Sequence, residues 1–524
     1  MSNITKVHLL KVMFEKNYEH TLYFETKERQ HEYFINRSIP SRTYSELYYQ
    51  RKDGIIMIPK HVDDLLSEGV NYCMYQNEKY PDKWFYAFIT DMKYVNDGNT
   101  EVHIKTDCIQ TWMFDINIKE SFVEREHADS DEIGEHTLDE GLETGEYVVN
   151  DFRADTNLQD CKYIIMTTEM PADADKWYAI NMGGIPYAGG AIICEHLSEM
   201  VSIVNALSAE GYADAVYAVY MVPSIIIADS GPDTMVYDGT TIPVMYNQEV
   251  SKLSALNGYY PRNKKLLCYP YTYLLHSNNA GSSNVLKFED FSTENCRFEV
   301  KGVPVVGGSI KSCPRNYKGV QVNQEEGIVC GKFPTLSWSA DLFTNWLTQN
   351  SVNIAMGIAS GAAQVVGGVA TMALTGGAGG AIGGATALSG VTSIANTLAQ
   401  VHQQSFTPNS ARGNTNAGDI NTAAKSNTFY YYSMSIKKEY AKVIDEYFDM
   451  FGYKCNRLKV PAKNHRERYW YTKTIGANIW GNIPQEDLQE IKDCYNRGIT
   501  FWRNDDLAIR DYDAFPNGIV KEGT

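Results

Sequence analysis

The residues with the most specific chemical meaning are apolar and lie in one uncharged segment. Between Leu342 and Ala411 the chain has no Asp, Glu, Lys or Arg, although charged residues make up 21% of the sequence. Within this segment, Ile354 to Leu374 and Ala381 to Val401 would each be about 31 Å long as helices, which matches the hydrocarbon core of a bilayer. The chemistry that this composition favours is insertion into lipid.

Both spans are marginal as permanent anchors, because Gln364 and paired glycines such as Gly367 and Gly368 lower hydrophobicity and helicity, at roughly 1 kcal/mol per glycine. A marginal span indicates conditional insertion. The residues that we expect to enter the membrane are Trp346, Leu347, Ile354, Met356, Ile358, Val365, Val366, Val369, Met372, Leu374, Ile382, Leu388, Val391, Ile394 and Leu398. The glycines that we expect to form the turn and the hinges are Gly376, Gly377, Gly379, Gly380, Gly413 and Gly418.

Two other structures are compatible with the uncharged segment: a buried helical hairpin and a disordered Gly/Ala linker. Its aliphatic residues are too numerous for a solvated linker. A buried hairpin of this composition needs a partner that covers it on nearly every side. An oligomer, or a lumen shared by several subunits, would provide that cover.

Two charged clusters are candidates for other chemistry. The acidic tract Asp129 to Glu146, with His127 and His136 nearby, has ligands for a hard cation but lacks the spacing of a ligand loop, so we predict a solvated loop. A basic cluster could bind phosphate or an acidic partner, and we expect it to meet acidic residues at a subunit interface. Its members are Lys454, Arg457, Lys459, Lys463, Arg466 and Arg468.

The remaining composition excludes several classes of function. The sequence contains none of the GxSxG, HExxH, Walker or GxGxxG motifs, so we predict no catalytic residues, no cofactor and no metal. Ten cysteines are scattered singly without a CxxC pair, which argues against disulfides and zinc. The net charge of −17 argues against a nucleic-acid-binding surface but allows DNA to pass without adhering. Met1 to Phe14 lacks the apolar core of a secretory signal, so we expect folding in a cytoplasm.

The elements that position these residues are mainly β in the N-terminal part. Short apolar runs separated by polar stretches indicate strands and turns. The clearest hairpin joins Lys83–Val95 to Thr100–Phe114 across Asn96 to Asn99, where an Asp-Gly pair accepts the positive φ angles of a tight turn. The other predicted strands are Val7 to Phe14, Thr21 to Thr26, Gly54 to Ile58 and Tyr72 to Gln76.

Beyond the N-terminal part, the patterns are mixed. The middle region combines helical spacing from Leu197 to Leu207 with an apolar run from Val216 to Ile227, which indicates α+β modules. Thr428 to Ile436 is a Tyr-rich strand and a candidate contact between subunits. Two helices follow. The first has one apolar face and ends at Gly452, and the residues of that face are Tyr440, Val443, Ile444, Tyr447 and Phe448. The second has Pro484 in its first turn and ends at Gly498, and the residues that face the core are Leu488, Ile491 and Tyr495.

Several long words of the sequence resemble the distal tail knob proteins of small, protein-primed podoviruses of the salasvirus type. They run in order from the N-terminal β region to the C-terminal helices, whereas the middle region matches only in scattered words. They are KWFYAFIT (83–90), IQTWMFDINIKESFVEREH (109–127), DEGL (139–142), YPY (269–271), FGYKCNRLKVP (451–461), DLQEI (487–491) and GITFW (498–502).

The resemblance implies a homohexameric tube at the distal tip of a phage tail, with β-barrel-like tube domains and an inserted hydrophobic hairpin. It also implies that the hydrophobic loops plug the tube and later penetrate the host cytoplasmic membrane, so that genomic DNA passes through the lumen. Other tail proteins, of the lower collar or tail tube, are the further implied partners, and the virion is the implied location. The domains that we expect are 1–150 (N-terminal tube), 151–333 (middle modules), 344–412 (membrane-active insertion) and 413–524 (C-terminal tube).

Two alternatives to a membrane-penetrating protein stay open at this point. One is a tail-tip enzyme that degrades peptidoglycan, although the sequence shows no catalytic constellation for it. The other is a hub or receptor-binding protein whose apolar segment only seals the tube.

Overall fold

The structure is a computed structural model in which the chain divides into two compact units. Unit 1 contains Met1–Gly145, Tyr259–Leu266 and Lys438–Thr524, and unit 2 contains Glu146–Gly258 and Leu267–Lys437. The structure describes residues 4–50, 54–78, 80–168, 177–182, 185–226, 244–279, 281–302, 309–332, 335–337, 428–462, 466–503, 511–512 and 517.

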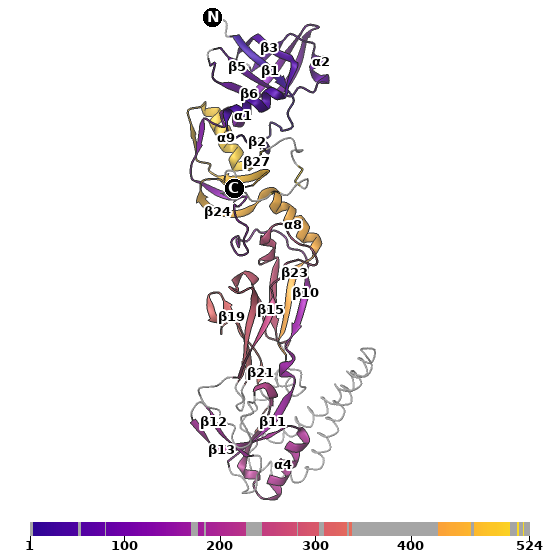
Figure 1. Ribbon diagram of the computed structural model, residues 1–524, viewed down its shortest axis with the longest axis vertical. Helices are drawn as coiled ribbons and strands as arrows, with labels where there is room; N and C mark the ends of the chain where they lie inside the picture. The colour runs from indigo at the N-terminus through magenta and orange to yellow at the C-terminus, as the bar shows by residue number, and fades with distance from the viewer. Residues whose placement is uncertain are drawn as a thin grey trace, which may run out of the picture. The chain divides into compact units, whose positions relative to one another are not determined.

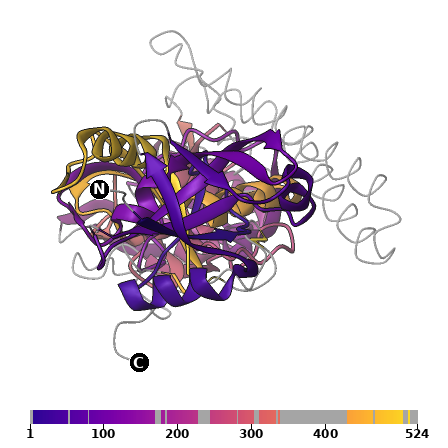
Figure 2. The same ribbon diagram turned by 90° about the horizontal axis from the view of Figure 1, so that it is seen from above.

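The N-terminal part of unit 1 is a closed β-barrel. Its interior is apolar, with Val7, Leu9, Ile56, Ile58 and Cys73 nearly or completely inaccessible to solvent. The barrel is drawn in indigo and violet in Figure 1 and is seen from above in Figure 2. In the order of their pairing, its strands are β1 (Ile4–Leu10), β3 (Ser38–Gln50), β4 (Ile55–Ile58), β7 (Asn99–Thr106), β6 (Trp84–Asn96) and β5 (Tyr72–Asn77).

The predicted hairpin is confirmed as β6 and β7, which pair up to Asn96 and Asn99, and the Gly98 N–H donates to Asn96 Oδ1 at 2.9 Å. The return strand is shorter than predicted. It ends at Thr106, because Asp107 accepts a hydrogen bond from the Gln110 N–H at 3.0 Å and so caps a helix instead. That helix is α3 (Cys108–Trp112).

Two further helices of the N-terminal part were not predicted from the sequence. The first is α1 (Lys27–Asn36), whose N-cap Thr26 accepts a hydrogen bond from the Arg29 N–H at 3.2 Å. The second is α2 (Val62–Ser67), capped by His61. A capping Thr followed by Glu28 in the first turn was the available signal for α1.

A second sheet completes unit 1 and joins distant parts of the chain. Its strands contribute Trp470, Trp502 and Tyr469 to a large aromatic core, in which these three side chains are almost fully buried. In order of pairing the strands are β2 (His20–Leu22), β27 (Ile499–Trp502), β25 (Tyr469–Ile475), β9 (Ser121–Glu126) and β24 (Tyr453–Lys459). A separate pair is formed by β8 (Ile116–Ile118) and β26 (Ile479–Gly481).

Both predicted C-terminal helices are confirmed, as α8 (Lys438–Phe451) and α9 (Gln485–Arg497). Pro484 lies one position earlier than predicted, at the N-cap of α9. The predicted apolar face of α8 is partly wrong, because Val443 is 65% exposed. The buried face of α8 includes the carboxylate of Asp445, which has partners outside the helix.

Unit 2 contains three sheets whose inner faces share a core that includes Phe298, Tyr431 and Ile164. The first sheet consists of β10 (Tyr147–Ala154), β23 (Tyr430–Ile436), β16 (Thr272–Ser277) and β17 (Ser283–Leu286). The second consists of β15 (Val244–Ser251), β18 (Asn295–Gly302), β19 (Ser309–Tyr317), β20 (Val320–Val322) and β21 (Ile328–Lys332).

The third sheet of unit 2 is covered by one helix, α4 (Leu197–Ala209), at the position where helical spacing predicted it. Met200 and Leu207 of α4 pack against Ile165 and Ile192 of the sheet. In order of pairing the strands are β12 (Trp177–Met182), β13 (Ile185–Cys194), β11 (Cys161–Thr167), β14 (Val216–Pro223) and β22 (Thr335–Ser337).

The described part of the chain also contains short 3-10 turns. They are η1 (Thr156–Leu158), η2 (Ala213–Ala215), η3 (Ser224–Ile226), η4 (Lys264–Leu267) and η5 (Phe288–Asp290).

Candidate functional site

The predicted membrane-insertion residues lie outside the described residues, and so do the predicted turn and hinge glycines. Within the described ranges, no helix is both long enough and apolar enough to cross a membrane. Membrane insertion therefore stays a prediction. What the structure does describe is how the acidic tract up to Gly145 and the described members of the basic cluster are used, and these lie in unit 1.

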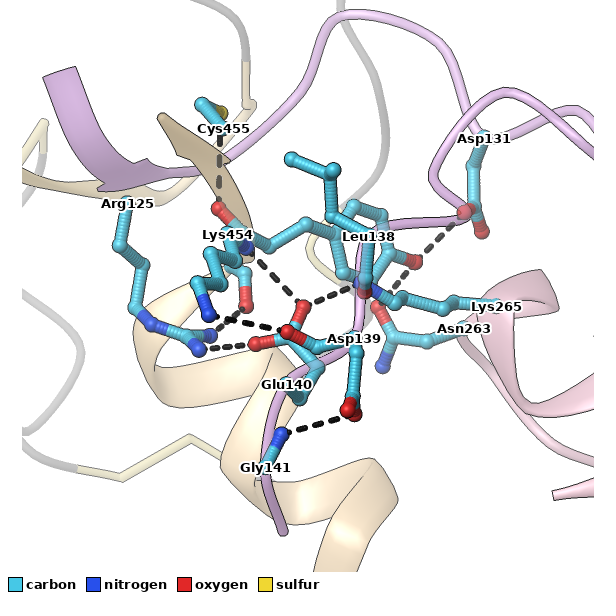
Figure 3. Close-up of polar contacts among 12 residues, drawn as sticks. Arg125, Asp131, Leu138, Asp139, Glu140, Gly141, Asn263, Lys265, Lys454 and Cys455 are labelled. Atoms are coloured by element: carbon cyan, nitrogen blue, oxygen red, sulfur yellow. Dashed lines mark hydrogen bonds and ion pairs between the residues drawn. The ribbon is translucent and has the colours of Figure 1, made fainter. Parts of the chain in front are cut away.

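The centre of this site is the carboxylate of Glu140, whose side chain is completely buried (Figure 3). Arg125 and Lys265 both form ion pairs with it, and their side chains are only 10% and 2% exposed. The backbone N–H of Lys454 donates to the same carboxylate at 3.0 Å. The Glu140 carboxylate thus neutralises part of the charge of two buried cations. Charged groups are buried at tolerable cost only when they are paired in this way.

Elements far apart in the sequence position these groups. Arg125 on β9 and Lys454 on β24 are direct partners in the antiparallel register. The Arg125 guanidinium also donates to the carbonyl of Gly452 at 2.7 Å. Gly452 has a φ of +63°, and a Cβ there would come within 2.2 Å of the Glu126 carbonyl, so only glycine allows this approach of α8 to β9.

Lys265 brings a third region of the chain to the site, because it belongs to η4. Its ammonium donates to the Leu138 carbonyl at 2.8 Å and lies 5.5 Å from the ring centre of Tyr453. The hydroxyl of Tyr453 in turn contacts Asp131, at 2.5 Å. The acidic tract is therefore held through the side chains of Asp131 and Glu140 and through the carbonyl of Leu138 (Figure 3).

A second buried carboxylate, Asp445 of α8, holds the residues just before η4. It accepts hydrogen bonds from the backbone N–H groups of Arg262 at 2.8 Å and Asn263 at 3.0 Å, and from the Tyr259 hydroxyl at 2.6 Å. One turn later, Asp449 pairs with the Arg262 guanidinium at 2.6 Å, and burial raises the pKa of Asp449 to about 6. The segment Tyr259–Leu266 is thus anchored to α8 by specific polar contacts.

These contacts correct one sequence-based interpretation. The solvated-loop prediction for the acidic tract is wrong for Glu140, which is buried and paired. In the basic cluster, Lys459 pairs with Glu126 of the same chain, and the interface with acidic residues of another subunit stays a prediction. Nothing in the sequence distinguishes Glu140 from its exposed neighbour Glu132, because the partners of Glu140 come from β9, η4 and β24.

The arrangement is suited to hold distant segments of unit 1 together and not to act on a substrate. The oxygens of Glu140 are occupied by three donors of the chain itself, so the carboxylate is not presented to a substrate. No group of three or more metal-ligating residues occurs among the residues that the structure describes. All ten cysteines are free, and burial raises the thiol pKa of Cys73 to about 12 and of Cys330 to about 11, which makes them poor nucleophiles.

Fold and site together define a β-rich structural protein whose distant segments are joined by buried ion pairs. The family described as Bacillus phage phi29, Tail knob protein gp9, C-terminal domain matches residues 237–515, more than half of the chain. The chain therefore belongs to the family of the phi29 tail knob protein gp9. Residues 3–118 match a second family, described as Caudoviral major tail protein N-terminus.

Individual relatives are similar over nearly the whole chain. The tail knob protein gp9 of Bacillus phage phi29 is 24% identical, over 96% of this chain and 97% of the relative. The protein of the same name from Bacillus phage B103 is 26% identical, over 96% of both chains. A solved structure with the same fold is the bacteriophage C1 tail knob protein gp12, with a TM-score of 0.61 and 16% identity over 98% of this chain and 100% of that one.

These findings confirm the predicted resemblance, the mainly β fold class and a structural rather than an enzymatic role. The chain is a component of the virion, in the distal part of the phage tail, and it associates there with other tail components. The peptidoglycan-degrading alternative has no support among the relatives, which are named as tail knob proteins.

Proposed function

We propose that six copies of this chain form the distal tube of the tail, that residues 344–412 of each copy plug the tube, and that they enter the host cytoplasmic membrane when the plug is released. The genomic DNA then passes through the lumen. The observation that carries the proposal is the absence of charged residues from Leu342 to Ala411 in a tail knob protein in which charged residues make up 21% of the sequence. The domain boundaries expected from the sequence are part of the proposal.

The energetics support release without a nucleotide or cofactor. Burial of apolar side chains in lipid provides roughly 25 cal/mol per Å². A chain with 47 basic and 64 acidic residues offers little attraction to DNA phosphates, so an acidic tube would let DNA slide. Contacts with the lower collar or tail tube would connect the knob to the rest of the tail.

Val366→Asp and Val369→Lys test the proposal, because both place a charge near the middle of the first span. A charge at the bilayer centre costs about 2.5 to 3.5 kcal/mol on insertion scales, and six copies multiply the effect. We expect normal assembly and thermal stability, at least a tenfold loss of dye leakage from liposomes, and virions that fail at membrane penetration.

The matched control is Val443→Asp, which adds the same charge at a valine that is 65% exposed on α8. It should leave leakage unchanged. Span variants that assemble and still permeabilise liposomes would refute the proposal, and variants that fail to fold would return the segment to a structural core. A deletion of residues 346–405 that leaves infection intact would instead favour a hub or receptor-binding protein.

A further inference from the structure

One face of the β10–β23–β16–β17 sheet in unit 2 consists of uncharged side chains. The register places Phe152, Tyr432, Leu275 and Val285 in one row across all four strands. Neighbouring rows on the same face contain Val149, Met434 and Tyr273 on one side and Ala154, Tyr430, Ser277 and Ser283 on the other. We call these eleven residues the aromatic face. None of them is charged, and strands β10 and β23 can be followed side by side in Figure 1.

The aromatic face, apart from the buried Ser277, is partly or largely open to solvent within the described part of unit 2. Val149 and Phe152 are each 51% exposed, and Val285 is 50% exposed. The opposite side of the same strands is the core, where Tyr431 and Leu274 are at most 1% exposed. A sheet with one buried face normally alternates to polar residues on its other face, and here that alternation fails.

The charged residues of the edge strand β10 do not lie on this face. Asp151 and Arg153 pair with Ser433 and Tyr431, which occupy the inward-facing positions of β23. The Arg153 guanidinium donates to the Glu249 carbonyl of β15 at 2.7 Å, toward the second sheet. The strands do contain charged residues, but the side chains of these residues point away from the aromatic face. The face is therefore uncharged.

The second sheet of unit 2 provides the contrast. Its positions away from the shared core carry ion pairs, with Arg297 at 2.8 Å from Glu249 and Arg315 at 3.9 Å from the buried Glu299. Glu249, Arg297 and Arg315 follow one another across β15, β18 and β19. The two sheets thus share a core and differ in what they present outward, which points to a contact role for the uncharged one.

Size and composition match the centre of a protein interface. The four strands have 8, 7, 6 and 4 residues and cover roughly 400 Å², from a strand spacing of about 4.8 Å and a rise of about 3.4 Å per residue. A standard interface buries about 800 Å² on each partner, with Tyr, Phe and Met enriched in its core and charged residues depleted. The aromatic face would be the core of such a contact, and the exposed Ser283 would belong to its rim.

We infer that the aromatic face is a contact surface for a second copy of this chain. This inference rests on the proposed hexamer and assigns one of its surfaces. Two copies with a net charge of −17 each repel one another, and an uncharged contact surface avoids placing like charges together in a desolvated interface.

The ring geometry favours a protein partner over a glycan. Phe152 stacks on Tyr430 with ring centres 5.9 Å apart and an interplanar angle of 21°, and Tyr430 stacks on Tyr432 at 6.2 Å and 22°. These rings therefore turn faces toward one another, whereas a sugar needs an open ring face to stack on. A ladder of ring edges and aliphatic groups fits a closely packed protein surface better.

Phe152→Glu and Val285→Glu, made singly and together, test the inference. Both residues are about half exposed, so the monomer should keep its melting temperature, while a like charge from every copy enters the contact. We expect the wild type to be hexameric by native mass spectrometry and sedimentation, and the double variant to dissociate at concentrations at least tenfold higher. The control is Val320→Glu, at a valine that is 46% exposed on β20 of the second sheet and should leave the hexamer intact.

Each outcome separates the inference from the proposed function. A hexameric wild type with equally hexameric variants overturns the inference and leaves the proposed tube standing. A monomeric wild type refutes the proposed hexamer and the inference with it. If Glu destabilises the fold, Phe152→Ser and Val285→Ser remove apolar area without charge and should still weaken association. Variants that stay hexameric but lose binding to purified glycan strands would assign the face to the cell wall and overturn the inference.

Discussion

Replacing Glu140 with Gln is expected to lower the free energy of unfolding of unit 1 by about 3 to 5 kcal/mol. The variant keeps the shape of the side chain but leaves Arg125 and Lys265 buried without their shared anion. Uncompensated burial of a cation costs more than the ion pair contributes, since water no longer reaches the charge. Chemical denaturation followed through the fluorescence of the buried Trp470 and Trp502 measures the loss.

The control for this variant is Glu132→Gln in the same acidic tract. The Glu132 side chain is 72% exposed, and its contact with Lys264 is 3.4 Å long. Exposed pairs of this kind contribute about 0 to 1 kcal/mol because solvent screens them. Equal losses of unfolding free energy for Glu140→Gln and Glu132→Gln would contradict the assignment of Glu140 as the carboxylate that holds the segments of unit 1 together.

Replacing His276 with Phe is expected to protect unit 2 against acid. His276 is fully buried among Phe298, Phe429 and Tyr431, its ring lies almost parallel to that of Tyr431 at 5.0 Å, and neither ring nitrogen has a hydrogen-bond partner in the described structure. Burial lowers the pKa of His276 to about 3. Phe has a similar shape and no nitrogen to desolvate.

The sign and the pH window follow from this pKa. As the pH falls below about 6.5, His276 takes up a proton in the unfolded chain. In the folded protein it does so only near pH 3, so stability is lost between these two pH values. The loss is about 1.4 kcal/mol per pH unit, or roughly 3 kcal/mol by pH 4. The difference in unfolding free energy between His276→Phe and the wild type should grow by this amount from pH 7 to pH 4. A constant difference would refute the prediction.

His127 in unit 1 provides a useful comparison because burial also lowers its pKa to about 3. Its Nδ1 accepts from the Tyr471 N–H at 2.7 Å, so its protonated Nε2 donates to the Asp449 carbonyl at 2.9 Å. Phe at this position would leave both backbone groups unpaired, which costs about 1 to 3 kcal/mol each. In addition, burial raises the pKa of Asp107 to about 7. This shift lowers the stability of unit 1 as the pH rises, whereas the shift of His127 lowers it as the pH falls. His276 is therefore the cleaner test.

Features that depend on neighbouring residues were predictable. The hairpin of β6 and β7 follows from Asp97-Gly98 between two apolar strands, and α9 follows from the spacing of Leu488, Ile491 and Tyr495 before Gly498. Each of these signals lies in one continuous stretch of the chain, so no distant partner is needed to read it. The uncharged segment is also continuous, and the words that resemble tail knob proteins are read directly from the residues.

Features that depend on distant partners were decided by the tertiary structure alone. The sequence by itself predicted a strand over Thr428 to Ile436, which the structure places at Tyr430–Ile436, but not its partners β10 and β16 or which of its tyrosines face outward. It specified a run of acidic residues, but not that Glu140 would be buried, because its partner Lys265 lies 125 positions away along the chain. Burial of a charge depends on the cations that surround it, and strand register depends on the two faces that must be covered. Those conditions exist only when the chain has folded.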